Sequence, residues 1–137
     1  MSKPTHAGLR HLALNVRDLT AMKQFYVDLL GFAVEWEPDA DNVYLSSGVD
    51  NLALHRADPL PSAPGSGARG ALDHLGLIVR EASDVDRWAE FLEGRGVTID
   101  APPRTHRDGA RSCYFKDPDG NVVQIIYHPP ISGKISS

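Results

Sequence analysis

Two histidines stand at the same place in two nearly identical stretches of the sequence. Residues 9–17 spell LRHLALNVR and residues 72–80 spell LDHLGLIVR, with six of nine positions identical and an offset of 63 residues. The histidines are His11 and His74. A duplicated module folds into two copies that face each other, so we expect both imidazoles to reach one pocket. Neutral imidazole nitrogens at such a place bind a divalent metal or contact substrate.

The duplication extends into the elements that must position these histidines. At the same offset Gly31 matches Gly94 and Val34 matches Val97. Alternating hydrophobicity predicts strands over Leu9–Val16 and Leu72–Val79. The first strand places its apolar side chains on the face that packs against a helix, and leaves a second face for three others: His11, Ala13 and Asn15. The corresponding face of the second half carries His74, Gly76 and Ile78.

A helix follows each of these strands. Asp18 is the predicted N-cap of a helix with an apolar stripe between residues 19 and 30. Gly31 stands where a left-handed C-terminal cap falls. Ser83 is the predicted N-cap of the second helix.

Three more strands are predicted in each half. They are Phe32–Glu37, Val43–Leu45 and Leu52–His55, then Val97–Asp100, Ala110–Phe115 and Val122–Tyr127. Residues 57–70, dense in Pro, Gly and Ser, form the predicted linker. The chain is therefore predicted to be one α+β domain, 1–137, of two βαβββ modules at about 8–56 and 71–130.

Composition narrows the class of partner. The net charge is −4, and 42% of the residues are hydrophobic, as in an ordinary globular protein. This balance argues against nucleic acid and against an anionic membrane surface as partners. The start of the sequence has no apolar segment typical of a signal peptide. The single cysteine, Cys113, excludes a disulfide framework, and a cytoplasmic location is expected.

These motifs resemble a known superfamily over residues 8–130. The paired modules, the HLAL stretch after Leu9, the pairs Phe25-Tyr26 and Leu30-Gly31, and above all the segment 114–121, YFKDPDGN, are similar to the vicinal oxygen chelate superfamily. Its members include glyoxalase I, methylmalonyl-CoA epimerase, extradiol dioxygenases, and the fosfomycin- and bleomycin-resistance proteins. The resemblance implies a cupped mixed sheet with helices on its outer face. Members share the scaffold rather than the chemistry.

The resemblance also implies a metal site. Its ligands come from the first and last strands of each module, which points to His11, His74 and Gln124. The fourth position falls on Ala53, which cannot bind a metal, while His55, two residues on, could replace it. Most members carry Glu where this chain has Gln124. An amide supplies no negative charge and no general base, which argues against a simple glyoxalase I assignment.

Three more residues are candidates for substrate contact. Tyr114 corresponds to a tyrosine that orients substrate in extradiol dioxygenases, with a core aromatic as the alternative. His106 and Arg111 belong to the segment that leads into the strand of Tyr114. They could bind an anionic group, or could belong to a solvated hairpin loop. Cys113 is expected to be a buried residue rather than a nucleophile.

Two functions from different classes remain open at this point. The first is an enzyme with a divalent ion (Fe, Mn, Ni or Zn) that acts on a small substrate with vicinal oxygens by a dioxygenase, lyase or isomerase step. The second is a metal-free binding protein that sequesters a small molecule, as bleomycin-resistance proteins do. The resemblance further implies a homodimer, with each pocket built either within one chain or across two.

Overall fold

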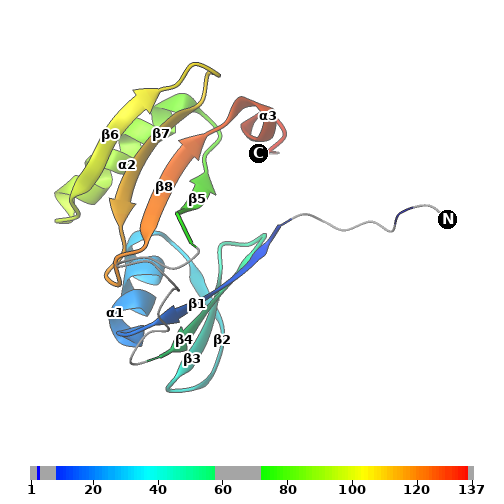
Figure 1. Cartoon of the computed structure of the whole chain (residues 1–137), viewed down its shortest axis with the longest axis vertical. Helices are drawn as coiled ribbons and strands as arrows, with labels where there is room; N and C mark the ends of the chain where they lie inside the picture. Colours follow the sequence, from blue (N-terminus) through cyan, green and yellow to red (C-terminus); the bar gives the residue numbers. More distant parts are fainter. Residues whose placement is uncertain (1–2, 4–8, 58–71, 136–137) are drawn as a thin grey trace, which may run out of the picture. The chain divides into compact units, whose positions relative to one another are not determined.

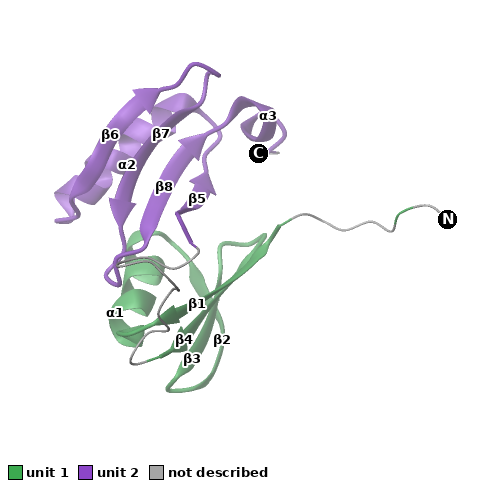
Figure 2. Cartoon of the chain, viewed as in Figure 1, with its two compact units in different colours: residues 1–61 green, residues 62–137 purple. Residues whose placement is uncertain are grey.

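The chain forms two compact units, each a small sheet with a helix. The structure, a computed structural model, describes residue 3, residues 9–57 and residues 72–135. Unit 1 comprises residues 1–61 and unit 2 residues 62–137 (Figure 2). Of the predicted linker 57–70, all but Ala57 lies outside the described residues. In the described part of the chain, no helix combines the length and the apolar character needed to span a membrane.

Unit 1 has the predicted order of strand, helix and three strands. Its elements are β1 (His11–Val16), α1 (Leu19–Gln24), the π-helical turn η1 (Phe25–Leu29), β2 (Ala33–Asp39), β3 (Asn42–Ser46) and β4 (Asn51–Arg56). The sheet order is β1-β4-β3-β2, with β1 parallel to β4 and the other pairs antiparallel (Figure 1).

Unit 2 repeats this arrangement. Its elements are β5 (Leu75–Ile78), α2 (Ala82–Gly94), β6 (Ile99–Thr105), β7 (Arg111–Lys116), β8 (Val122–Tyr127) and the one-turn helix α3 (Pro129–Ser132). The sheet order is β5-β8-β7-β6, and β5 is parallel to β8. The α+β class and the paired βαβββ modules are confirmed.

One face of each sheet packs against its helix. In β1, Leu14 and Val16 are buried whereas the alternate residues are exposed, as the alternation predicts. In unit 2, α2 contacts β6, β7 and β8, and it buries Val85 and Leu92. We call the opposite side of each sheet its helix-free face.

The helix ends follow the predicted chemistry in one unit and differ in the other. The Asp18 carboxylate accepts a hydrogen bond from the backbone N–H of Ala21 at 3.0 Å, which confirms the predicted N-cap. The prediction of Ser83 is wrong, because α2 begins earlier with Glu81 as its N-cap. The backbone N–H of Glu81 donates to Asp84 at 3.1 Å, so this pair completes a capping box.

The spacing of the repeat changes after the helix. Gly31 has φ +80° and its structural counterpart is Gly96 at φ +84°, rather than Gly94. Both provide the left-handed turn after the helix that only glycine adopts without strain. The second module has two more residues between its first strand and this turn. The identities of Gly31 with Gly94 and of Val34 with Val97 at the offset of 63 therefore do not mark structurally equivalent positions. The first strand of unit 2 is also shorter than the predicted Leu72–Val79.

The edge strands β2 and β6 both carry two register shifts. Along β2 the pairs run Val34 with Leu45, Trp36 with Tyr44 and Asp39 with Asn42, so each shift adds one residue to β2. Such bulges reverse the face on which the following residue lies. Strict alternation would place Trp36 on the same face as Val34. The first bulge turns it instead onto the helix-free face beside Tyr44.

Candidate functional site

The helix-free face of unit 1 presents His11 with a defined orientation. The Nδ1 atom of His11 lies 2.8 Å from Oδ1 of Asn51, and Nδ2 of Asn51 donates to Glu35 at 2.9 Å. The carboxylate only accepts, which fixes the amide so that its oxygen faces the imidazole. His11 must therefore carry its proton on Nδ1 and keep a lone pair on Nε2. This is the tautomer that metal-ligating histidines use.

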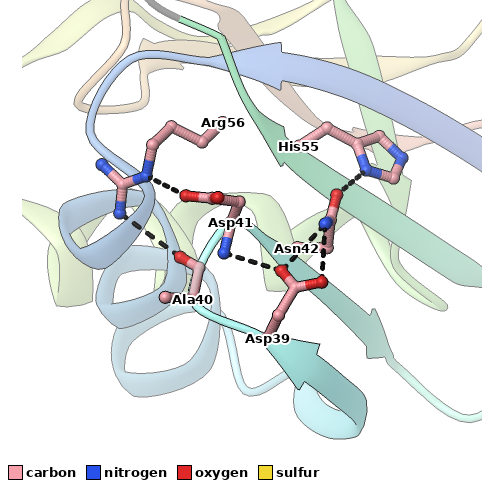
Figure 3. A network of polar contacts seen from close by, with 6 residues as sticks. All are labelled: Asp39, Ala40, Asp41, Asn42, His55 and Arg56. Atoms are coloured by element: carbon pink, nitrogen blue, oxygen red, sulfur yellow. Dashed lines mark hydrogen bonds and ion pairs between the residues drawn. The ribbon is translucent and has the colours of Figure 1, made fainter.

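His55 on β4 is oriented by a second relay of the same kind. Its Nδ1 atom lies 2.6 Å from Oδ1 of Asn42. The amide of Asn42 donates to both carboxylate oxygens of Asp39, at 2.9 and 3.2 Å (Figure 3). Hydrogen bonds from the backbone of Asp41 and the side chain of Asn42 lower the pKa of Asp39. His55 thus also keeps its lone pair on Nε2.

The relay of His55 is built at the tip of the β2–β3 hairpin. Arg56, the next residue of β4, donates to Asp41 at 3.0 Å and to the carbonyl oxygen of Ala40 at 3.4 Å (Figure 3). The backbone N–H of Asp41 donates to Asp39 at 2.8 Å. The hairpin tip is therefore tied both to β4 and to the carboxylate that begins the relay, which holds Asn42 in place for His55.

The strand register identifies equivalent positions in the two units. Two residues after His11, Ala13 pairs with Ala53, and two residues after His74, Gly76 pairs with Gln124. Ala53 and Gln124 are therefore counterparts, with no register shift in β4 that would bring His55 to that position. The next strand in each sheet adds Tyr44 opposite Ala53 and Tyr114 opposite Gln124.

In unit 2 three of the predicted residues form a connected group. The rings of His74 and Tyr114 meet edge to face, with centroids 5.6 Å apart. The amide of Gln124 donates to the Tyr114 hydroxyl at 2.9 Å. Gln124 is only 7% exposed. This orientation leaves the carbonyl oxygen of Gln124 as the atom able to accept or to ligate.

His74 itself stands just before β5. Its Nδ1 atom lies 2.6 Å from a carboxylate oxygen of Asp73. A carboxylate that accepts from Nδ1 leaves the Nε2 lone pair outward, as in the carboxylate–histidine pairs around bound metals. All three histidines thus keep Nε2 available as an acceptor. Nδ1 contacts an asparagine side chain in His11 and His55, and a carboxylate in His74. The donor chemistry fits a divalent ion that takes imidazole and amide ligands.

The two predicted substrate-binding residues lie on opposite sides of β7. Nε2 of His106 lies 3.0 Å from the hydroxyl of Ser112, which shares the helix-free face with Tyr114. Arg111 points toward α2, where it makes two hydrogen bonds to Asp86 at 2.9 and 2.7 Å. These bonds lower the pKa of Asp86 and raise that of Arg111. A substrate role for Arg111 would require this ion pair to open.

Cys113 is fully buried on the helix side of β7. Burial raises the pKa of its thiol, so the nucleophilic thiolate is disfavoured. Among the described residues, no three His, Cys, Asp or Glu side chains are grouped so that they could hold a metal ion.

Sequence reasoning missed the residues that orient the histidines. The sequence did not single out the asparagines Asn42 and Asn51, or the carboxylates of Asp39 and Glu35 that orient them. Their roles depend on strand register rather than on spacing along the chain. Trp36 was also missed, since only a bulge brings it to the helix-free face. The runs Asp39–Asn42 and Asp50–Asn51, rich in Asp and Asn, were the available signal, and that composition is equally typical of turns.

Comparison with known proteins shows which family has a similar sequence and fold. A family model described as the Glyoxalase/Bleomycin resistance protein/Dioxygenase superfamily matches residues 8–125. The crystal structure of a lactoylglutathione lyase from Agrobacterium tumefaciens is similar with a TM-score of 0.76 and 25% identity, covering 94% of this chain and 98% of that one.

Two curated relatives carry activities in their names. The metallothiol transferase FosB of Staphylococcus saprophyticus is 27% identical over 119 residues, which cover 86% of this chain and 75% of that protein. The biphenyl-2,3-diol 1,2-dioxygenase 3 of Rhodococcus globerulus is 29% identical over 124 residues, 85% of this chain and 61% of that protein.

Proposed function

Because the chain belongs to the glyoxalase/bleomycin resistance protein/dioxygenase superfamily, we propose that it is a divalent-metal-dependent enzyme acting on a small substrate with vicinal oxygens. The observation that carries this proposal is the shared tautomer of His11 and His74. Each imidazole gives its Nδ1 proton to an oxygen acceptor and keeps Nε2 for a ligand.

The proposed ligands are His11, His74 and the carbonyl oxygen of Gln124. His11 belongs to unit 1, and His74 and Gln124 belong to unit 2. The proposal therefore takes these ligands from one chain or from two. A homodimer is part of the proposal, and sedimentation equilibrium measures it. The ion, Fe, Mn, Ni or Zn, would act as a Lewis acid on substrate oxygens.

The residues of the chain have separate tasks in this proposal. Tyr114 holds the Gln124 amide with its oxygen outward and offers its own hydroxyl proton to a substrate oxygen. His106, near Ser112 on the same face, is a candidate for contact with substrate. Because Gln124 cannot take up a proton near neutral pH, a step that needs a base must use an imidazole such as His55. The reaction is a dioxygenase, lyase or isomerase step, and we place it in the cytoplasm.

Metal binding tests the proposal directly. Protein purified without chelator is analysed for bound metal, and Mn²⁺ is titrated into chelator-treated protein. We expect one site per chain, and we expect His11→Ala, His74→Ala and Gln124→Ala each to weaken it about tenfold or more, at least the cost of losing a residue that only orients a ligand. His106→Ala is the matched control, because its Nε2 already contacts Ser112.

The same titration distinguishes the metal-dependent enzyme from the alternative, a metal-free binding protein. A protein that remains metal-free, and whose Mn²⁺ affinity does not respond to loss of His11 and His74, would be a small-molecule binding protein instead. Circular dichroism of the variants ensures that a lost site is not a lost fold.

A further inference from the structure

Helix α2 carries a second stripe of side chains beside the one that it buries against the unit 2 sheet. Its buried residues are Val85, Ala89 and Leu92. Residues that recur at spacings of three and four along a helix share one flank, and five side chains of α2 and its C-cap do so: Asp84, Arg87, Trp88, Phe91 and Arg95. We call these five residues the aromatic flank. The Phe91 side chain is 39% exposed, so the flank is open to a partner.

The aromatic flank is ordered by its own contacts. The rings of Trp88 and Phe91 meet edge to face with centroids 5.7 Å apart, and the guanidinium of Arg95 lies 4.8 Å from the centre of the Phe91 ring. Toward the other end of the helix, Arg87 donates to Asp84 at 2.7 Å. Side chains that are already held in place lose little conformational entropy when a partner binds.

The aromatic flank is hollowed at its middle. A hollow of about 280 Å³ is lined by four of its residues, Asp84, Arg87, Trp88 and Phe91. These are positions i, i+3, i+4 and i+7 of the helix, the four that surround the hole into which a facing helix inserts one side chain. The shape of the hollow therefore favours another helix as its occupant.

A second copy of α2 supplies a matching side chain. When two identical helices pack antiparallel about a twofold axis that passes between Ala89 and Glu90, Trp88 lies opposite Phe91 of the second copy. Each Phe91 ring then lies at the hollow of the other copy. The same axis places Asp84 opposite Arg95 of the second copy, because the two residues stand equally far from it along the chain.

Charge selects the antiparallel arrangement. In it two carboxylates face two guanidinium groups, whereas a parallel pair would bring Asp84 against Asp84 and Arg95 against Arg95. Asp84 keeps its hydrogen bond from Arg87, because its two oxygens offer about four acceptor sites. The flank thus carries both halves of one self-complementary contact, which favours a second copy of this chain over an unrelated helix.

We propose that the aromatic flank of α2 binds the same flank of a second copy of this chain, as an antiparallel helix pair around a twofold axis. This goes beyond the proposed function, which includes a homodimer but assigns it no surface, and it needs no metal. The helix lies on the side of the unit 2 sheet opposite Tyr114 and Gln124, so the contact does not involve the helix-free face of that unit. A helix of 13 residues buries less than the about 800 Å² per partner of a standard interface, so we expect a dissociation constant in the micromolar range.

Sedimentation equilibrium of the full-length protein measures the association, and Phe91→Ala tests the aromatic contact. We expect Phe91→Ala to raise the dissociation constant about tenfold or more, in protein that keeps its thermal unfolding midpoint. Ile131→Ala is the matched control, because it truncates another apolar side chain of unit 2, 49% exposed and away from α2. A parent protein that stays monomeric at millimolar concentration, or a dimer that Phe91→Ala weakens no more than Ile131→Ala does, would overturn the proposal.

Charge variants test the antiparallel pairing. They all carry Arg87→Gln, so that one carboxylate and one cation remain on each flank. Arg95→Glu alone and Asp84→Lys alone should each weaken self-association about tenfold or more, because like charges then face each other. Mixed in equal amounts, the two variants should associate about as tightly as protein with Arg87→Gln only, since both contacts of the mixed pair join opposite charges.

Stability is followed alongside association in these variants. Asp84 also accepts from the backbone N–H of Glu81, so the thermal unfolding midpoint of each variant is measured to show that α2 is intact. A mixture of folded variants that associates no better than either variant alone would overturn the antiparallel pair.

Metal binding is measured separately from association, so the two proposals can fail separately. A dimer that depends on Phe91 and Arg95, in protein that binds no Mn²⁺, leaves this contact standing and ends the metal-dependent function. Protein that binds Mn²⁺ through His11, His74 and Gln124 but stays monomeric overturns this contact and the homodimer, and leaves the metal site standing.

Discussion

Gly76 pairs with Gln124 across β5 and β8, and a Cβ atom at position 76 would lie 3.3 Å from Oε1 of Gln124. The missing side chain thus leaves room for the oxygen that we propose as a ligand. In Gly76→Ala the Gln124 side chain must shift by a few tenths of an ångström. We expect Mn²⁺ affinity to fall about three- to tenfold, because a shift of this size uses up much of the about 0.5 Å within which a ligand must be held. Titration of chelator-treated protein measures this.

Thermal unfolding supplies the second readout for Gly76→Ala. A Gly to Ala change at an unstrained strand position stabilises the fold by about 0.4–1 kcal/mol through the unfolded chain, and the forced shift of the Gln124 side chain offsets this gain. Stability should therefore stay close to that of the parent protein while metal affinity falls. Gly94→Ala is the control, since a Cβ atom there would meet nothing within 4 Å. If both variants bind Mn²⁺ like the parent protein, Gly76 does not position Gln124.

The relay from Glu35 through Asn51 predicts an effect at a residue that touches no ligand. Asn51→Leu removes the acceptor of the Nδ1 proton of His11. The imidazole can then rotate or change tautomer, so Mn²⁺ affinity should fall about 10- to 100-fold, the usual cost of losing a hydrogen-bond partner that orients a ligand. The change is read by calorimetric titration.

Asn15→Leu is the matched control for Asn51→Leu. Asn15 also lies exposed on the helix-free face of β1, but its register partner is His55 rather than a residue beside His11. It should leave Mn²⁺ affinity within about twofold of the parent, as expected of an exposed substitution away from the ligands. A similar loss in both variants would mean that the face responds to any apolar change, and the relay would have no special role.

The fold was predictable from sequence because alternation and turn residues are local signals. The alternation around His11 gave the correct faces of β1, and the glycine of the 117–121 turn has the positive φ of +90° that a turn requires. The register also supports the predicted equivalence of Ala53 and Gln124. These features depend on neighbours in the chain, which the sequence displays directly.

The parts of the site that escaped prediction depend on non-local geometry. Trp36 reaches its face only because a bulge adds one residue to β2 against β3. Asn51 meets His11 across a parallel pair of strands that are 40 residues apart in the chain. Arg111 lies on the side of its strand that faces α2. Its place beside a loop in the sequence does not determine which face of the strand it occupies. A shift of one residue in strand register would exchange the two faces, and no local sequence pattern fixes the register at these positions.

The ion pair between Asp86 and Arg111 makes stability depend on pH. Because the hydrogen bonds from Arg111 lower the pKa of Asp86, the folded state favours the ionised carboxylate. This contribution is present above the unfolded pKa of about 3.9 and is lost as the pH falls through the lower folded value. Asp86→Asn should reduce the free energy of unfolding near pH 7 by up to about 1 kcal/mol, because solvent screens a partly exposed pair.

The difference between parent and Asp86→Asn should shrink below about pH 4, as Asp86 of the parent takes up a proton and loses its charge. Urea unfolding at several pH values measures it. Asp28→Asn removes the same charge elsewhere on the surface and should show little change at any pH. A difference between parent and Asp86→Asn that stays constant down to the lowest pH would show that the ion pair is not its source.

Gln124→Glu tests what the amide does at the proposed ligand position. A carboxylate brings the negative charge that the amide lacks, so it neutralises a dication better and should raise Mn²⁺ affinity at least about tenfold, or ~1.4 kcal/mol. The Tyr114 hydroxyl can turn from acceptor to donor, so its hydrogen bond to residue 124 persists. In Tyr114→Phe combined with Gln124→Glu that bond is gone, and the gain should be smaller. A carboxylate at 124 that leaves Mn²⁺ affinity unchanged, in a protein that still unfolds cooperatively, would mean that this side chain does not face the ion.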